Sequence, residues 1–107
     1  PILMKKITVP LHDYVGDFAE NKDVAKKIRV NIIIPHLRAG DEVIFDFQGI
    51  SGATQSFVHA LLSEPIRMFQ DVAYDNLCYI NANRSTKEII SIVYRYMQES
   101  LSSGELS

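Results

Sequence analysis

Short apolar runs alternate with amphipathic helical stretches along this chain, and this alternation constrains the fold more than any other feature. The alternation predicts an α/β domain with a small mixed, partly parallel sheet of about four strands and three helices. The main expected elements are strands at 6–9, 43–47 and 77–80, a helix over 22–38, and helices that begin near Thr54 and Ser85.

Local signals refine these elements. Residues 11–21 lack a clear period and are expected to form a loop, with room for a further short strand around Tyr14 and Val15. The nearly continuous apolar run at 43–47 predicts a strand buried on both faces, in the middle of a parallel sheet. Because proline has no backbone N–H, Pro35 is expected to kink the end of the first long helix and Pro65 to kink or restart the second.

Two further signals mark helix ends. Gly40 is a plausible stop for the helix over 22–38. Ser85 and Glu88 stand three residues apart at the start of the last apolar stripe. This spacing predicts a capping box, in which each side chain accepts a hydrogen bond from a backbone N–H of the first turn.

A length of 107 residues predicts one domain, 1–107. Hydrophobic residues make up 47% and charged residues 22%, which is typical of an ordered globular chain. The small polar residues 102–107 predict a flexible tail. Two explanations of residues 1–4 stay open. Either a cloning remnant precedes a native start at Met4, or the whole chain is a piece of a longer protein.

Charge and cysteine content narrow the function classes. Eleven basic against thirteen acidic residues argue against a dedicated nucleic-acid binder. No apolar run approaches the ~20 residues that span a bilayer, so no membrane association is expected. The lone Cys78 excludes an internal disulfide, and a cytoplasmic setting is expected. The three histidines lack metal-ligand spacing, so no metal or other cofactor is expected.

The segment that follows the 43–47 strand is the most informative one for function. Gly49 and Gly52 lie in a loop that leads into the helix near Thr54. The loop lacks the Gly-Lys-Ser/Thr ending of a phosphate-binding P-loop and the third glycine of a dinucleotide fingerprint. Asp46, at the end of the apolar strand, needs hydrogen bonds if it is buried. It either caps loop N–H groups or belongs to a recognition site.

The turn at 81–84 follows the next strand. If the two strands are parallel, this turn opens at the same edge of the sheet as the glycine loop. We call the side chains expected to gather there the polar ledge: Ser51, Thr54, Ser56, Asn81, Asn83 and Arg84. No nucleophile and general base can be paired among these residues, so no enzymatic activity is expected.

The stretch from Val43 to Phe57 resembles the STAS-like domain family of unknown function. That family has a hydrophobic strand ending in Asp, then a glycine, then a Ser-Ser-Phe that opens a helix. Arg29 and the Pro-x-Leu at 35–37 fit the preceding helix of the family. The resemblance covers 24–62 through motifs and the rest of the chain through the order of strands and helices.

The family is similar to the STAS domains of bacterial anti-sigma-factor antagonists. Those proteins are not enzymes, and they bind a kinase of the GHKL ATP-binding class. Phosphorylation of the first serine at this helix start switches the binding. Gln55 stands at that position here, so the resemblance leaves Ser56 and Thr54 as candidate phosphorylation sites, and Arg84 as a candidate contact for the phosphate.

The reading favoured by these observations is a non-catalytic regulatory module that binds a GHKL-type ATP-binding kinase-like protein. The loop and helix over 49–62 would make the contact, including the helical residues Val58, His59 and Leu62. The candidate partner-binding residues are Asp46, Gly49, Ser51, Gly52, Thr54, Ser56, His59, Asn83 and Arg84. Two alternatives stay open: a small ligand-binding domain or enzyme that uses the polar ledge, and an oligomerisation domain of a larger protein.

Overall fold

The computed structural model describes residues 4–103, and it confirms the α/β class. Residues 1–3 and 104–107 lie outside the described part, and with them most of the predicted remnant, 1–4, and of the predicted tail, 102–107. The elements in chain order are β1 (Lys6–Pro10), α1 (His12–Val15), β2 (Phe18–Ala19), α2 (Lys22–Ile28), η1 (Arg29–Ile33), α3 (Ile34–Arg38), β3 (Glu42–Asp46), β4 (Gly52–Ala53), α4 (Gln55–Phe69), α5 (Asp71–Asn76), β5 (Leu77–Ile80) and α6 (Arg84–Ser103).

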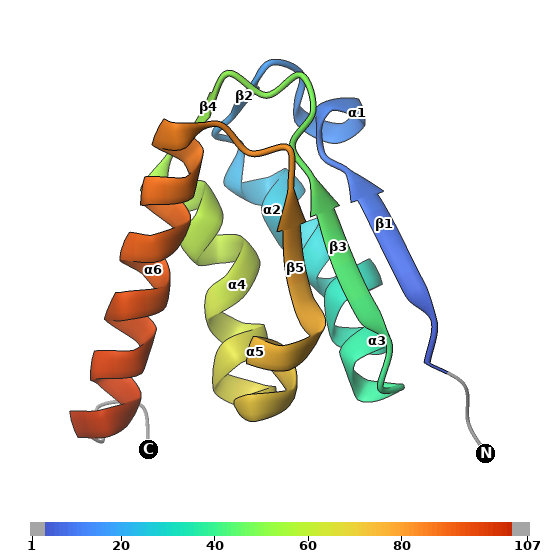
Figure 1. Cartoon of the computed structure of the whole chain (residues 1–107), viewed down its shortest axis with the longest axis vertical. Helices are drawn as coiled ribbons and strands as arrows, with labels where there is room; N and C mark the ends of the chain where they lie inside the picture. The colour runs from blue at the N-terminus through green and yellow to red at the C-terminus, as the bar shows by residue number, and fades with distance from the viewer. Residues whose placement is uncertain (1–3, 104–107) are drawn as a thin grey trace.

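The strands form two parallel sheets in place of one sheet of about four. The larger sheet has the order β1-β3-β5, and the smaller one pairs β2 with β4. Because each crossover from one strand to the next parallel neighbour is right-handed, both crossovers of the larger sheet place their helices on the same face. Figure 1 shows α2, α3 and α4 behind the three strands.

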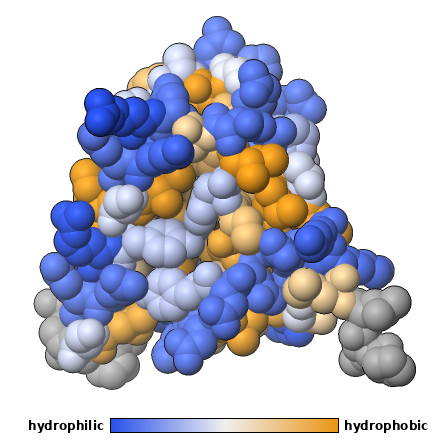
Figure 2. Space-filling view, in the orientation of Figure 1, coloured by the Kyte–Doolittle hydropathy of each residue, from blue (hydrophilic) through white to orange (hydrophobic). Residues whose placement is uncertain are grey.

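This arrangement corrects the prediction for the central strand. β3 is indeed the middle strand, but its burial alternates: Val43 and Phe45 are fully buried, while Ile44 is only partly buried. The partly buried side chains point to the face that none of the helices within residues 4–103 covers, where Ile80 of β5 is 42% exposed. Figure 2 shows apolar side chains among polar ones over this part of the molecule.

A continuous helical segment spans 22–38, as predicted, but its middle is a π-helical turn. The N–H of Ile34 donates to the carbonyl of Arg29, five residues earlier. Pro35 follows directly, and its ring would collide with the carbonyl of Asn31 in a regular α-helix. The wider π-turn relieves that collision and absorbs the predicted kink. Gly40, at φ +84°, follows the end of the helix, as predicted.

α4 is held against this segment by Arg29. The guanidinium Nη1 donates to the carbonyl of Ala60 at 2.8 Å, and Nε lies 3.9 Å from Glu64. Pro65 lies inside α4, and the helix neither ends nor restarts there. The break comes at Gln70, whose φ of 48° separates α4 from α5, so the predicted restart at Pro65 is wrong.

Two more stretches differ from the predictions where they are described. Tyr14 and Val15 belong to α1, and the extra strand β2 lies at Phe18–Ala19. Of the predicted flexible tail, 102–107, residues 102 and 103 belong to α6, and the rest lies outside the described residues. An apolar pair such as Tyr14-Val15 suits a strand or one helical turn equally well, and only the packing decides.

Candidate functional site

The carboxyl ends of β3 and β5 meet, as predicted from their parallel pairing. Asp46 at the end of β3 accepts hydrogen bonds from the side chain of Asn81 and from the N–H of Gln48, both at 2.9 Å. These bonds, with Asn81 contributing most, hold the pKa of Asp46 below its usual value. The carboxylate thus caps the glycine loop, which confirms the structural alternative. A direct contact of Asp46 with a partner stays a prediction.

The two glycines of the loop are required by close packing. Gly49 has φ +85°, and a Cβ there would lie 2.9 Å from Cδ2 of His12. A Cβ on Gly52 would lie 2.8 Å from Cε1 of Phe18. Gly52 is also part of β4, which pairs with β2, so the end of the predicted loop is a strand. Both glycines shape the loop and bring it against the segment that follows β1.

Ser51 and Asn83 tie three segments together. The hydroxyl and the N–H of Ser51 both donate to the carbonyl of Asp17, at 3.0 and 2.6 Å. The Nδ2 of Asn83 donates to the carbonyl of Ser51 at 2.9 Å. This part of the polar ledge is therefore a hydrogen-bonded joint between the segment at Asp17, the glycine loop and the turn at 81–84. Asn83 connects two of these segments, in addition to its place in the turn.

Asn83 is also the cap of α6, which corrects the predicted capping box. Its Oδ1 accepts from the N–H of Thr86 at 2.9 Å and from the hydroxyl of Ser85 at 3.2 Å. The helix begins at Arg84, so Ser85 is already its second residue. Asparagine is as favourable as serine at the cap position of a helix. Here the hydrogen bond from Asn83 to Ser51 holds the asparagine at that position.

The first turn of α4 presents the side chains that are free to meet a partner. Thr54 caps the helix, since its Oγ1 accepts from the N–H of Phe57 at 3.1 Å. Gln55 and Ser56, the first two helical residues, are exposed. His59, one turn on, lies edge-on to the ring of Tyr96 at 5.7 Å between ring centres.

These side chains line an open surface hollow of about 510 Å³. We call it the Ser56 hollow, and its lining residues are Lys22, Gln55, Ser56, His59, Ala60 and Tyr96. Val58 and Leu62 were predicted to take part in the contact, but they are buried in the core at 1% and 0% exposure. The helical period explains this, because Val58 and Leu62 share the inward face of α4 with Leu61.

Arg84 does not join this surface. It lines a different hollow, on the outer side of α6, with Lys87 and Arg95. The predicted polar ledge is thus divided. Ser51, Asn81 and Asn83 belong to the joint between the loops, Thr54 caps α4, Ser56 lines the Ser56 hollow, and Arg84 lines the hollow on α6.

The family model of the STAS-like domain of unknown function (DUF4325) matches residues 24–87, which is more than half of the chain. This chain belongs to that family. No curated protein and no solved structure matches it.

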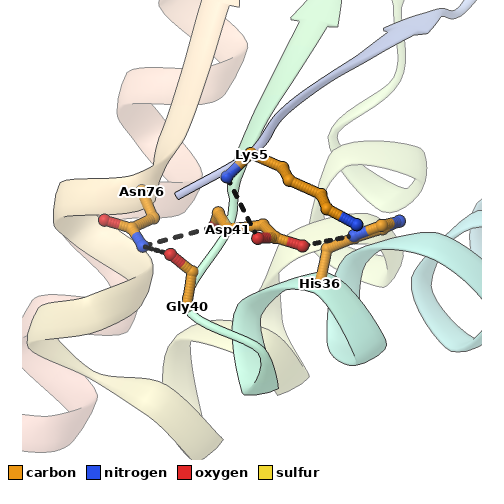
Figure 3. Close-up of polar contacts among 5 residues, drawn as sticks. All are labelled: Lys5, His36, Gly40, Asp41 and Asn76. Carbon is orange, nitrogen blue, oxygen red and sulfur yellow. Dashed lines mark hydrogen bonds and ion pairs between the residues drawn. The ribbon is translucent and has the colours of Figure 1, made fainter. Parts of the chain in front are cut away.

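A second polar cluster of this STAS-like domain lies at the opposite end of the strands (Figure 3). Nδ1 of His36 and Oδ2 of the buried Asp41 are 2.8 Å apart, and Oδ1 accepts from the backbone N–H of Lys5 at 3.2 Å. The side chain of Asn76 donates to the carbonyls of Gly40 and Asp41. The hydrogen bond from His36 is the main cause that lowers the pKa of Asp41. The cluster joins the α3–β3 turn to β1 and to the end of α5.

No group of three or more metal-ligating side chains gathers within residues 4–103 of the STAS-like domain. Over the same residues, no helix combines the length and the apolar character needed to cross a bilayer. Sequence reasoning missed Lys22 and Tyr96, which complete the Ser56 hollow. Neither residue belongs to a motif, and only the packing of α2 and α6 beside α4 brings them to Ser56.

Proposed function

We propose that this STAS-like domain is a non-catalytic regulatory module that binds a protein partner through the glycine loop and the first turns of α4. One observation carries the proposal. Gln55 and Ser56 are exposed at the start of a helix whose loop and flanks are fixed by hydrogen bonds and close packing. A polar surface on a rigid support needs little ordering when it binds.

The partner that we propose is a GHKL-type ATP-binding kinase-like protein in the cytoplasm. The support is the resemblance of the 43–57 stretch to the anti-sigma-factor antagonists. In the anti-sigma-factor antagonists, the helix start that corresponds to α4 contacts the kinase. In this chain the start of α4 carries side chains that a protein surface can reach: Gln55, Ser56 and His59. The open shape of the Ser56 hollow also suits a protein surface better than a small enclosed ligand.

If the module is switched by phosphorylation, Ser56 is the better acceptor than Thr54. The hydroxyl of Thr54 is engaged as the cap of α4, whereas the exposed Ser56 makes no such bond. A phosphate at the second helical position would be stabilised by the helix dipole and free N–H groups. Lys22 lines the same hollow and replaces Arg84 as the expected cation beside it.

The test is the affinity of the domain for a GHKL-type protein encoded beside its gene, measured by isothermal titration calorimetry. Ser56→Glu should weaken binding about tenfold or more while the melting temperature is kept. Gln98→Glu is the matched control, because it adds the same charge at an exposed residue of α6 that lines neither hollow. Equal binding by the Ser56→Glu and Gln98→Glu variants would place the interface elsewhere.

Phosphorylation of Ser56 is tested by a separate measurement. After incubation of the complex with ATP, mass spectrometry should find phosphate on Ser56 and none on Thr54. A stable complex that carries phosphate on neither residue would mean that Gln55 marks a constitutive binder.

A further inference from the structure

The outer face of α6 carries three exposed cations in one row. Arg84, Lys87 and Arg95 recur at spacings that place them on the same side of the helix. They line an open hollow of about 540 Å³, which we call the α6 face. Its lining residues are Arg84, Lys87, Glu88, Ser91, Ile92 and Arg95.

Within the described part of the chain, no acidic side chain forms an ion pair with any of the three cations. The ion pairs of residues 4–103 are His12–Asp17, Arg29–Glu64 and His36–Asp41. Glu88 lies on the same face as Arg84 and Lys87 but is paired with neither. The α6 face is therefore a local concentration of positive charge on a chain whose net charge is −2.

The position of two of these cations opposes the helix dipole. Arg84 is the first residue of α6 and Lys87 the fourth, and the first turn has no acidic residue. Acidic side chains are favoured at helix starts. Asp23 at the start of α2 and Asp71 at the start of α5 follow that preference. The stability of α6 therefore does not explain Arg84 and Lys87, and a feature that breaks a local rule without structural gain points to function.

An apolar side chain lies among the cations. Ile92 is 38% exposed on the α6 face, whereas Val93 and Met97 of the same helix are buried in the core. A ligand that matches this face needs an apolar contact for Ile92 and negative charges on either side. An amphipathic helix with acidic residues has both.

We infer that the α6 face is a docking surface for an acidic amphipathic helix of a protein partner. A nucleic acid fits less well, because three cations on an otherwise acidic domain are few and Ile92 would face a charged backbone. The inference does not rest on the proposed function, since the lining residues of the α6 face and of the Ser56 hollow do not overlap.

The probe for the test is a synthetic peptide of about 15 residues in which Glu and Leu repeat with helical period. A peptide with Gln at every Glu position is the matched probe. Each is titrated into the isotope-labelled domain and followed by backbone amide chemical shifts. The acidic peptide should shift the resonances of residues 84–95 in a saturable way. Its affinity should fall as the salt concentration rises, because salt screens exposed charges.

The variant that tests the cations is Arg84→Glu/Lys87→Glu, which should weaken binding of the acidic peptide on the order of tenfold. Its melting temperature should stay at or above that of the unchanged domain, because acidic residues suit a helix start. The control is Lys26→Glu/Lys27→Glu on α2, which makes the same change of charge at exposed positions away from α6. This control should bind as the unchanged domain does.

Four outcomes would overturn the inference. These are the absence of any saturable shift at residues 84–95, equal binding of the Gln peptide, and equal weakening by the α2 control. The fourth is tighter binding of an RNA oligonucleotide to the same residues, which would make the α6 face a nucleic-acid contact. Binding of the acidic peptide by the Ser56→Glu variant at full strength is expected and separates the two surfaces.

Discussion

The side chain of Asn83 donates a hydrogen bond to the carbonyl of Ser51, 32 positions earlier in the chain, at 2.9 Å. The same side chain caps α6 through its other atom, Oδ1. A single amide group thus fixes both the glycine loop and the start of the last helix. The two surfaces proposed for binding begin on either side of this joint.

Asn83→Ala should destabilise the domain by about 0.5–2 kcal/mol, because it removes the helix cap and the tether to Ser51 together. Asn83→Asp separates the two roles, since an aspartate still caps α6 but has no N–H to donate. Urea unfolding measures both variants. The aspartate variant should keep most of the stability and show amide shifts at Ser51 and its neighbours. An alanine variant as stable as the unchanged domain would contradict the assigned role.

Gly49→Ala should destabilise the domain by more than Gly40→Ala does. Both glycines have a positive φ, +85° and +84°, which costs an alanine roughly 1–2 kcal/mol. A Cβ at Gly40 meets nothing within 4 Å, whereas one at Gly49 meets the ring of His12 at 2.9 Å. Thermal unfolding of the two variants isolates the cost of the steric contact. His12→Ala in the Gly49→Ala background should recover that part and no more.

Asp41 should make the domain sensitive to acid. Its pKa in the folded chain is lowered, chiefly by the hydrogen bond from His36. A carboxylate with a lowered pKa stabilises the fold above its unfolded pKa of about 3.9, and the contribution is lost as the pH falls through the lowered value. Asp41→Asn should therefore be less stable at neutral pH and lose less of its remaining stability on acidification.

Urea unfolding between neutral pH and about pH 3 checks this behaviour. The exposed Asp75, outside the cluster of Figure 3, provides the control as Asp75→Asn. A parallel loss of stability with acid in the unchanged domain and in Asp41→Asn would contradict the prediction.

Cys78 should react slowly with alkylating agents. Burial first, and then the hydrogen bond to Glu42 at 2.9 Å, raise the pKa of the thiol to about 11. Since only the thiolate is a good nucleophile, iodoacetamide at pH 8 should modify the folded chain on the order of a hundredfold more slowly than the urea-unfolded chain. Glu42→Gln removes the neighbouring charge and should accelerate the reaction. Equal rates in the folded and unfolded chains would be inconsistent with this pKa.

The apolar strands of four or five residues and the long helical stripes were predictable from the sequence, and the two-residue strands were not. β1, β3 and β5 lie where apolar runs predicted strands, and the helical segment that begins at Lys22 is long enough for its period to emerge. β2 and β4 have two residues each, which is too few for any periodicity, and they exist because their partners lie side by side. The bare face of β3 could not be predicted either, since an apolar run does not reveal which face the helices cover.

For the candidate site, the order of strands along the chain predicted which loops meet. It did not predict which side chains hold the loops together and which ones line a surface hollow. The parallel pairing of β3 and β5 was enough to bring Asp46 and Asn81 together. The sequence could not show that Arg84 lines the hollow on α6, or that Lys22 lines the same hollow as Ser56. Those positions depend on how three helices pack, which no local motif records.

The order β1-β3-β5 has a consequence for how the chain reaches this structure. Neighbouring strands of the larger sheet are joined by contacts between residues 36 positions apart, both from Lys5 to Asp41 and from Cys78 to Glu42. Since none of the described strands pairs with a close neighbour in the chain, no hairpin can form early among them, and each pairing closes a loop of similar length and entropy. We therefore expect folding to wait for the helical segments, and to be slower than that of a helical bundle of the same length.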